Sequence, residues 1–234
     1  MIRRTITAGA ATLILGLAAL AGCGSPAAPD AAPPELGIPV NPLPGTGQFD
    51  NATPVSLRVY HPGKEGTPTI ASTRSTWVPL GLQASGEIQV PAEKTPQVLG
   101  WYCPGRVAGT THLPNGNCMA PVPGAMGPAV VIGHINGDGH DGVFRHLDQV
   151  KKGDVIDVGM NTGKIVRFVA SDAGMPAKTA FPSDKVYGNT DTPEIRLISC
   201  GGRLDPRYNE GVQYHRYIDQ VIVWGRLAPD QPKQ

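Results

Sequence analysis

Three residues that could carry out acyl transfer stand at the edges of short apolar runs. Cys200 ends one run and is followed by two glycines, His134 ends another at 129–134, and Arg216 opens a third at 217–224. A thiolate attacks carbonyl carbons, an imidazole moves protons near neutral pH, and a guanidinium is a permanent positive charge. Together they could cleave an acyl bond through a thioester, provided that the fold brings them to one place.

The N-terminal segment has the features of an export signal. Two arginines precede an uncharged apolar stretch that ends at Leu-Ala-Gly-Cys, residues 20–23. These four residues look like the bacterial lipobox, in which the cysteine receives diacylglycerol and becomes the first residue of the mature protein. We therefore expect a lipoprotein signal peptide at 1–22 and a lipid anchor on Cys23, at the extracytoplasmic face of the bacterial cell membrane. An uncleaved signal anchor is the alternative, because 6–22 is just long enough to span a bilayer.

The rest of the chain divides into a tether and one domain. Residues 23–54 are rich in Ala, Pro and Gly and hold few side chains that could build a core, so a flexible tether is expected there. Residues 55–234 have the length of a single domain. The net charge of +1 implies no nucleic acid or other highly charged partner.

The remaining cysteines can be assigned by context. Because export permits disulfides, we expect Cys103 to pair with Cys118 across a loop of about 15 residues. The competing interpretation is a metal site with His112, but only three ligands are in view and no CxxC spacing occurs. With Cys23 lipidated, Cys200 is the cysteine left as a free thiol.

Short strand-like runs separated by Gly, Pro and Asn cover the domain. Strands are expected at 55–59, 77–80, 87–91, 99–102, 129–134, 155–158, 164–169, 194–200 and 217–224. The central runs indicate an antiparallel meander with one turn of helix at 142–148. The connection 171–193 is long enough to be a functional loop carrying a short helix. With no βαβ alternation, an all-β fold is predicted, as a closed or nearly closed barrel.

The motifs that carry the chemistry resemble those of the sortase family, the cysteine transpeptidases of the cell envelope. The resemblance lies in Gly133-His134, in Leu197-Ile198-Ser199-Cys200 and in 216–223, and it covers about 55–227. Leu-x-Ser-Cys-Gly-Gly corresponds to the family's Leu-x-Thr-Cys. Further segments look most like the class F branch: 87–91, 100–102, 128–134, 142–144 and 200–202. The resemblance implies an eight-stranded sortase-like β-barrel with short helices and long loops, and no cofactor.

The resemblance also implies a role for each residue. Cys200 would be the nucleophile and His134 the general acid and base, with His140 and His146 as nearby rivals and His112 and His215 further away. These roles follow the family's use of a thiol and an imidazole in acyl transfer.

The arginine departs from the family pattern. Class F members often read Tyr-Arg-Asp-Asn, whereas residues 217–220 read Tyr-Ile-Asp-Gln. Arg216 lies two residues before Ile218, and strand side chains repeat every two residues, so Arg216 should face the same side. It is the expected cation for the oxyanion, with Arg207 and Arg203 as alternatives.

The implied reaction starts with attack of Cys200 on a C-terminal sorting signal of the Leu-Pro-x-Thr-Gly type. Expected partners are secreted proteins with such a signal, and the acyl group would pass to a peptidoglycan precursor, a protein lysine or water. Ser199, beside the nucleophile, and Phe181, Pro182 and Tyr187 in the long connection are candidates for the substrate groove. The three loop residues could equally fix the loop to the barrel.

Other functions remain open at this level. An L,D-transpeptidase would carry Ser-His-Gly-Cys, which residues 198–201 lack. A non-catalytic, lipid-anchored β-barrel that binds peptides is favoured by the displaced arginine. A metal site at His134, Asp138, His140 and Asp141 matches no EF-hand or HExxH spacing, so no metal is expected.

Overall fold

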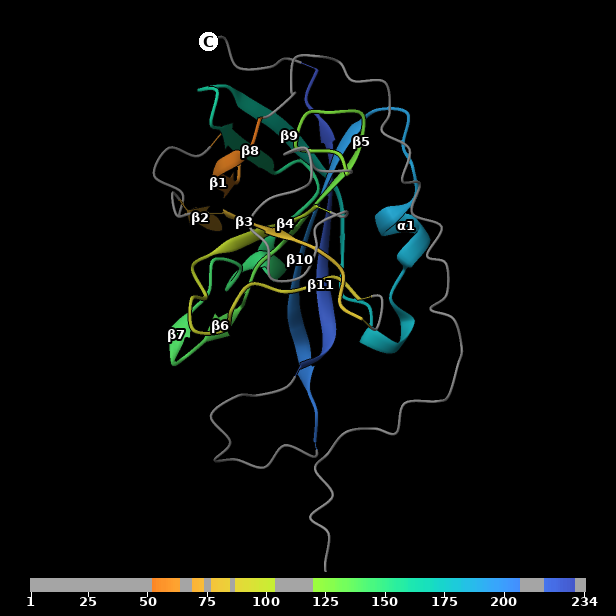
Figure 1. Ribbon diagram of the computed structural model, residues 1–234. Helices are drawn as coiled ribbons and strands as arrows, with labels where there is room; N and C mark the ends of the chain where they lie inside the picture. Colours follow the sequence, from red (N-terminus) through yellow and green to blue (C-terminus); the bar gives the residue numbers. More distant parts are fainter. Residues whose placement is uncertain are drawn as a thin grey trace, which may run out of the picture. The chain divides into compact units, whose positions relative to one another are not determined.

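The structure is a computed structural model, and it describes residues 52–63, 69–73, 77–84, 87–103, 120–206 and 217–229. All of them belong to one compact unit. The described residues form mostly β-strands with little helix (Figure 1), which confirms the all-β prediction. None of the helices among them is long and apolar enough to cross a membrane.

The strands and helices follow one another closely along the chain. The strands are β1 (Pro54–Tyr60), β2 (Ala71–Thr73), β3 (Trp77–Leu80), β4 (Leu99–Tyr102), β5 (Gly127–Ile132), β6 (Asn136–Gly137), β7 (His140–Asp141), β8 (Val155–Met160), β9 (Ile165–Gly174), β10 (Pro193–Leu204) and β11 (Tyr217–Leu227). The helical elements are two 3₁₀ turns, η1 (Leu147–Gln149) and η2 (Lys178–Ala180), and the α-helix α1 (Ser183–Tyr187).

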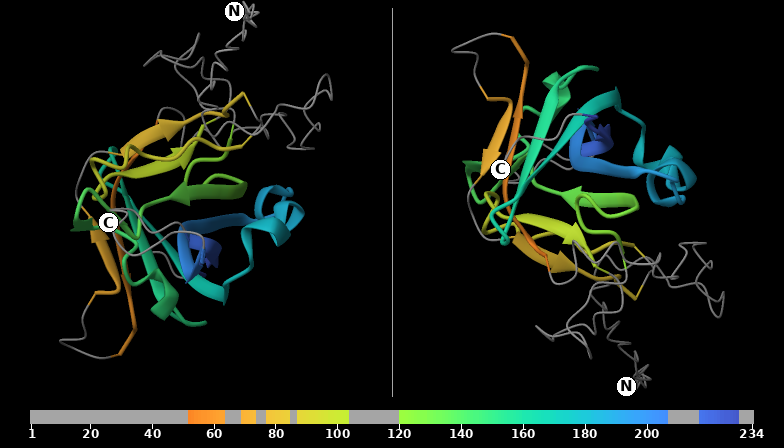
Figure 2. Two further views of the ribbon diagram at one scale, coloured as in Figure 1. Left: turned by 90° about the horizontal axis from the view of Figure 1, so that it is seen from below. Right: turned by 90° about the horizontal axis from the view of Figure 1, so that it is seen from above.

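Nine of the strands form one curled sheet. Its order is β2-β1-β8-β9-β11-β10-β5-β4-β3, and β6 and β7 form a separate hairpin. Neighbours in the large sheet are antiparallel except for the pairs β5–β10 and β3–β4, which are parallel. Figure 2 shows the sheet curving round its core like half of a barrel.

The predicted closed or nearly closed barrel of eight strands is corrected by this sheet, which has nine described strands and is not closed. Its edge strands β2 and β3 do not pair with each other in the described part of the chain. Closure needs edge strands long enough to share a ladder of hydrogen bonds. β2 has three residues and β3 has four, and Pro79 in β3 has no N–H to donate.

The strand predictions were mostly right, but the predicted pairing was right only for β8 and β9. The expected strand 87–91 is reduced to an isolated bridge between Ile88 and Leu82. β8 and β9 form the expected antiparallel hairpin, whereas β5 joins β10 and β4 instead of β8. Residues 143–146 form turns, and the helical turn is confined to η1. The long connection does carry a short helix, α1.

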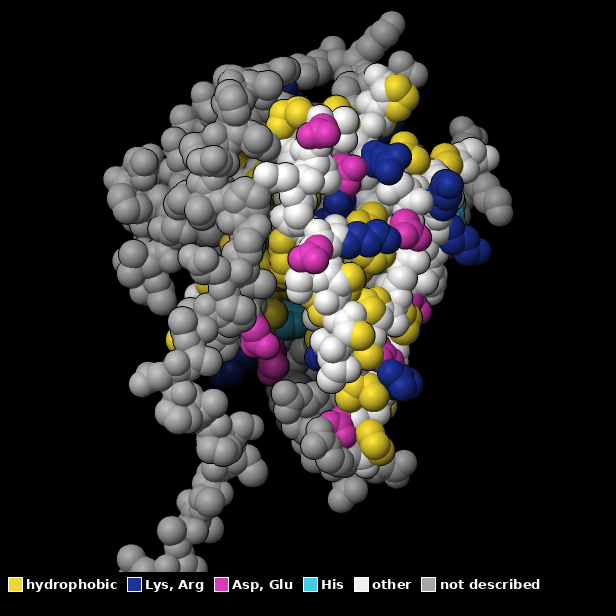
Figure 3. Space-filling view, turned by 90° about the vertical axis from the view of Figure 1, so that its right-hand side faces the viewer, with side chains coloured by type: hydrophobic (Ala, Val, Ile, Leu, Met, Phe, Trp, Pro, Cys, Tyr) yellow, Lys and Arg dark blue, Asp and Glu magenta, His cyan; other side chains and the backbone are white. Residues whose placement is uncertain are grey.

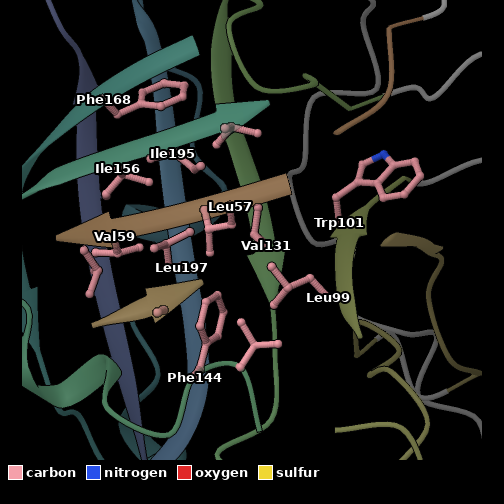
Figure 4. Packing of buried hydrophobic residues seen from close by; sticks show 14 of the residues in the cluster. Leu57, Val59, Leu99, Trp101, Val131, Phe144, Ile156, Phe168, Ile195 and Leu197 are labelled. Carbon is pink, nitrogen blue, oxygen red and sulfur yellow. The ribbon is translucent and has the colours of Figure 1, made fainter. Parts of the chain in front are cut away.

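The two faces of the central strands enter different apolar clusters. Ile195 and Leu197 of β10 point to the interior of the curl (Figure 4), where they pack with residues of β1, β5, β8 and β9. Ile198, the next residue, faces the opposite side, in a cluster with Trp224 and the fully buried Val186 of α1. Because side chains alternate along a strand, the even-numbered residues of β10 lie on the face that α1 covers.

Candidate active site

The parallel pairing of β5 and β10 brings His134 and Cys200 to the same end of the sheet, although only β5 ends there and β10 continues past Cys200 to Leu204. β5 and β10 run in register up to Ile132 opposite Ile198. Beyond this pair, the Gly133 N–H donates to the Ile198 carbonyl oxygen at 3.1 Å. His134 lies two residues after Ile132, and Cys200 lies two residues after Ile198. Because side chains alternate along an extended chain, both side chains lie on the same face as the two isoleucines.

Ser199 links β10 to the segment that follows β5. Its hydroxyl donates to the Gly133 carbonyl oxygen at 2.9 Å, and the residue is 2% exposed. The sequence placed Ser199 in the substrate groove. In the structure its hydroxyl links β10 to the backbone of the segment that carries His134, and its contact with a substrate stays a prediction.

The thiol of Cys200 is free and half-buried, and Cys200 lies opposite Gln220 of β11. The two glycines after it are required by the close approach of β11. A Cβ atom on Gly201 would lie 2.6 Å from a methyl group of Val221. Gly202 has φ +71°, a conformation that favours glycine, and a Cβ there would lie 2.6 Å from the Asp219 carboxylate. The Cys-Gly-Gly motif therefore reflects packing as well as chemistry.

His134 is held by a backbone carbonyl. Its Nε2 lies 2.7 Å from the Pro91 carbonyl oxygen, which can only accept a hydrogen bond, so Nε2 carries the proton. Nδ1 is then the nitrogen that can accept a proton from a thiol. The backbone is fixed as well, because the Phe144 N–H donates to the His134 carbonyl oxygen at 3.0 Å.

The rival histidines lie elsewhere. His140 is exposed on β7, and His146 is exposed, where its Nδ1 accepts from the Gln149 side chain at 3.3 Å. His112 and His215 lie outside the described residues.

Of the arginine candidates, Arg203 is described, whereas Arg216 and Arg207 lie outside the described residues. The Arg203 guanidinium donates to both oxygens of Asp219, at 2.9 and 2.7 Å, and its backbone N–H donates to the same carboxylate at 2.9 Å. Next to Asp219, the Gln220 N–H donates to the carbonyl oxygen of Pro176, so β11 is tied at this point to the connection after β9. The hydrogen bonds of Arg203 therefore join β10 to β11 at this end of the sheet.

The Asp219 carboxylate should make stability depend on pH. Hydrogen bonds from the Arg203 side chain, and then from its backbone N–H, lower the pKa of Asp219 to about 2, below an unfolded value of about 3.9. The ionised form is thus favoured by folding, and its contribution is present above pH 4 and lost as the pH falls through about 2.

We expect Asp219→Asn to lower the melting temperature by a few degrees at pH 7, and the difference from the unaltered protein should shrink toward pH 2. Thermal melts at several pH values would measure it, with the exposed Asp148→Asn as the control that changes little. A melting-temperature difference that stays constant over this pH range would contradict a stabilising role for the Arg203–Asp219 pair.

Aromatic residues of the long connection lie beside the strand ends. The Tyr187 ring is 5.8 Å from that of Phe181 and 6.2 Å from that of Tyr102, between ring centroids. These three residues share an apolar cluster with Ile132 and Ile198. Burial raises the pKa of Tyr102 to about 12 and also raises that of Tyr187.

The structure thus brings two of the predicted groove residues, Phe181 and Tyr187, close to the Cys200 edge. Pro182 is half-buried, and its carbonyl oxygen accepts from the Val186 N–H in the first turn of α1. Together with Tyr102 these two residues form an aromatic wall. The sequence did not indicate Tyr102 as a member of it, because nothing in the segment Leu99–Tyr102 predicts a contact with α1.

Among the described residues, which include His134, Asp138, His140 and Asp141, no group of three or more His, Cys, Asp and Glu side chains is arranged to hold an ion. His112 and Cys118 of the other metal alternative lie outside the described residues. Cys103 is buried and disulfide-bonded. Cys118 lies outside the described residues, so the pairing of these two cysteines stays a prediction.

The fold and the site define a β-sheet protein with a thiol and an imidazole at the end of a parallel strand pair. The family model described as "Sortase domain" matches residues 93–227, more than half of the chain. The chain belongs to the sortase family.

Solved structures similar to this chain are also sortases. Sortase C-3 of Streptococcus pneumoniae is 22% identical over 47% of each chain, with a TM-score of 0.35. The pilus island 1 sortase C2 of Group B Streptococcus is 16% identical over 74% of this chain and 73% of its own, with a TM-score of 0.41. The sortase D5 transpeptidase of Clostridium perfringens is 14% identical over 74% and 78%, with a TM-score of 0.43.

This chain spans about half the length of the first of these structures. A search of curated proteins found no match.

Proposed function

We propose that this protein is a class F-like sortase, a cysteine transpeptidase that cleaves a C-terminal sorting signal of the Leu-Pro-x-Thr-Gly type. The observation that supports the proposal is the parallel register of β5 and β10, which pairs Ile132 with Ile198, so that a half-buried free thiol and a hydrogen-bonded imidazole each follow two residues later at the same end of the sheet. Membership of the sortase family supports it.

The chemistry follows from the proton positions. The Cys200 thiol gives its proton to Nδ1 of His134, and the sulfur attacks the scissile carbonyl carbon. As the tetrahedral intermediate collapses, the C–N bond breaks and the imidazolium returns the proton to the leaving amine. A thioester remains on Cys200. An amine from a peptidoglycan precursor or a protein lysine, or else water, then attacks the thioester and regenerates the thiol.

The decisive experiment is to incubate the protein with a library of Leu-Pro-x-Thr-Gly peptides and to measure its intact mass. A thioester adduct on Cys200 supports the proposal. If no library member gives an adduct, the non-catalytic peptide-binding function takes its place, which is favoured by Ile218 at the position where class F members often have arginine.

Arg216 is our candidate for stabilising the oxyanion. We expect Arg216→Ala to lower kcat/KM by about 10²–10³-fold, the usual effect of losing one oxyanion donor. Arg203→Ala should lower it far less, because its guanidinium is engaged by Asp219. Peptide-cleavage kinetics would measure both, and Ile218→Arg in the Arg216→Ala protein should restore part of the activity. Unchanged activity in Arg216→Ala would exclude this residue.

We also propose that the protein works at the extracytoplasmic face of the bacterial membrane, anchored by a lipid on Cys23 and extended on the tether 23–54, with residues 55–234 as the catalytic domain. Residues 1–51 lie outside the described part of the chain, so this proposal rests on the sequence. The mass of the protein extracted from membranes tests it: an N-terminal Met1 in place of a diacylglycerol-modified Cys23 would rule it out.

A further inference from the structure

A cavity of about 610 Å³ opens on the face of the sheet that α1 covers. Figure 3 shows this side of the molecule, with Lys, Arg, Asp and Glu side chains interspersed among apolar ones. Arg196 of β10 lines the cavity and precedes Cys200 by four residues, which is about 13 Å along a strand. Lys185 of α1 also lines it, whereas Tyr187 packs on Tyr102. The cavity and the aromatic wall therefore use different sides of α1.

Two guanidinium groups in the cavity wall share one carboxylate. Arg196 is 3% exposed and donates to Glu194 at 2.6 Å, while the Nε of Arg226 lies 3.7 Å from the other oxygen of Glu194. Burial lowers the pKa of Arg196, Glu194 raises it, and the charge of Arg226 lowers it further. One carboxylate does not satisfy both cations, so positive charge is in excess around Glu194.

The rest of the lining leaves this excess unchanged, because Lys152 and Lys185 are matched in number by Asp172 and Asp184. Asp172 is already paired with Lys185 at 2.8 Å, and Lys152 acts on the same carboxylate from a greater distance. In all, four Lys or Arg residues line the cavity against three Asp or Glu residues, a net charge of +1.

A buried donor at the cavity also has no partner. Trp224 lines the cavity at 6% exposure, and the Lys185 ammonium lies 4.0 Å from the centre of its ring. Its indole N–H is buried and makes no hydrogen bond within the described residues. An indole N–H can only donate, and a buried donor without an acceptor is costly. The cavity therefore has an excess of cations, which favours an anion, and one of its lining residues carries a buried N–H that would sense a change there.

We propose that this cavity binds an anionic group, a phosphate or a carboxylate, through Lys152 and Arg226, beside Trp224. Charge-assisted hydrogen bonds from Lys and Arg to such groups are the strong members of their class. The site is separate from Cys200, so its occupancy does not depend on whether the protein cleaves peptides.

The test uses the purified full chain and follows its tryptophan indole N–H signals by ¹H–¹⁵N NMR during titration with sodium phosphate, with sodium acetate, and with sodium chloride at matched ionic strength. The Trp224→Phe protein assigns the signal. Trp77 is the internal control, because its indole N–H is also buried and unpartnered but does not line the cavity. We expect a saturable shift of the Trp224 signal and none of the Trp77 signal. Saturation with phosphate or with acetate identifies which anion chemistry the site takes.

Two variants connect the shift to the cavity. Lys152→Ala and Arg226→Gln should each raise the Kd by about fivefold, the effect of losing roughly 1 kcal/mol from an exposed ion pair. The matched control is Lys151→Ala, which removes the same charge from an exposed neighbour outside the cavity. The proposal is overturned if neither anion gives a saturable shift, if chloride gives the same shift, or if both variants keep the Kd of the unaltered protein.

Discussion

The Cys200→Ala protein should form no adduct with any sorting-signal peptide and should lose peptide cleavage by at least about 10⁴-fold, because removing the nucleophile of a covalent mechanism leaves binding alone. Cys200 is the free cysteine of the described residues, so no second thiol there can replace it. Intact mass and cleavage kinetics measure the two effects.

Loss of folding must be separated from loss of chemistry. Cys200 is half-buried and alanine is smaller than cysteine, so Cys200→Ala should melt within a few degrees of the unaltered protein. Ser171→Ala, which removes a hydroxyl donor to the Trp224 carbonyl oxygen away from the strand edge, is the control that should keep its cleavage activity. Cleavage that survives in Cys200→Ala would refute the thioester mechanism.

Local sequence patterns were enough to predict the two strands that lead to His134 and Cys200. The apolar run before His134 and the run before Cys200 each became a strand, β5 and β10, because strand formation depends on alternation and turn residues close in sequence. The glycines at 201 and 202 were predicted to end the strand, but β10 continues through them to Leu204, with a register shift against β11. Glycine is needed at these positions because Val221 and Asp219 of β11 approach closely. That contact is distant in sequence, so the local pattern could not predict it.

The pairing of those strands was not predictable in the same way. Alternation shows that a run can be a strand and does not show its neighbour, so β5 was wrongly grouped with β8 and β9. For the same reason the contact of Tyr102 with Tyr187 and the sharing of Glu194 by two arginines could not be foreseen. In sequence, Arg196 looks like a solvent-facing residue of an alternating strand, yet it is almost fully buried.

The position of His134 shows how the fold adds to the sequence. The segment before Pro91 was expected to be a strand, and in the structure it is extended chain with one isolated bridge. A carbonyl that is not used in a ladder is available to another donor, and the Pro91 oxygen lies 2.7 Å from Nε2 of His134. The missing strand thus supplies the group that sets the tautomer of the imidazole.

His134→Gln should lower kcat/KM for peptide cleavage by about 10²–10⁴-fold, the usual contribution of a general acid and base. The glutamine amide can still donate to the Pro91 carbonyl oxygen in place of Nε2, but it cannot take a proton from Cys200. His146→Gln, at an exposed position, should keep nearly full activity. Alkylation of Cys200 by iodoacetamide gives a second readout, because His134→Gln should slow the reaction and flatten its pH dependence. If both cleavage and alkylation remain within about twofold of the unaltered protein, His134 is not the base, and the parallel strand ends serve packing rather than catalysis.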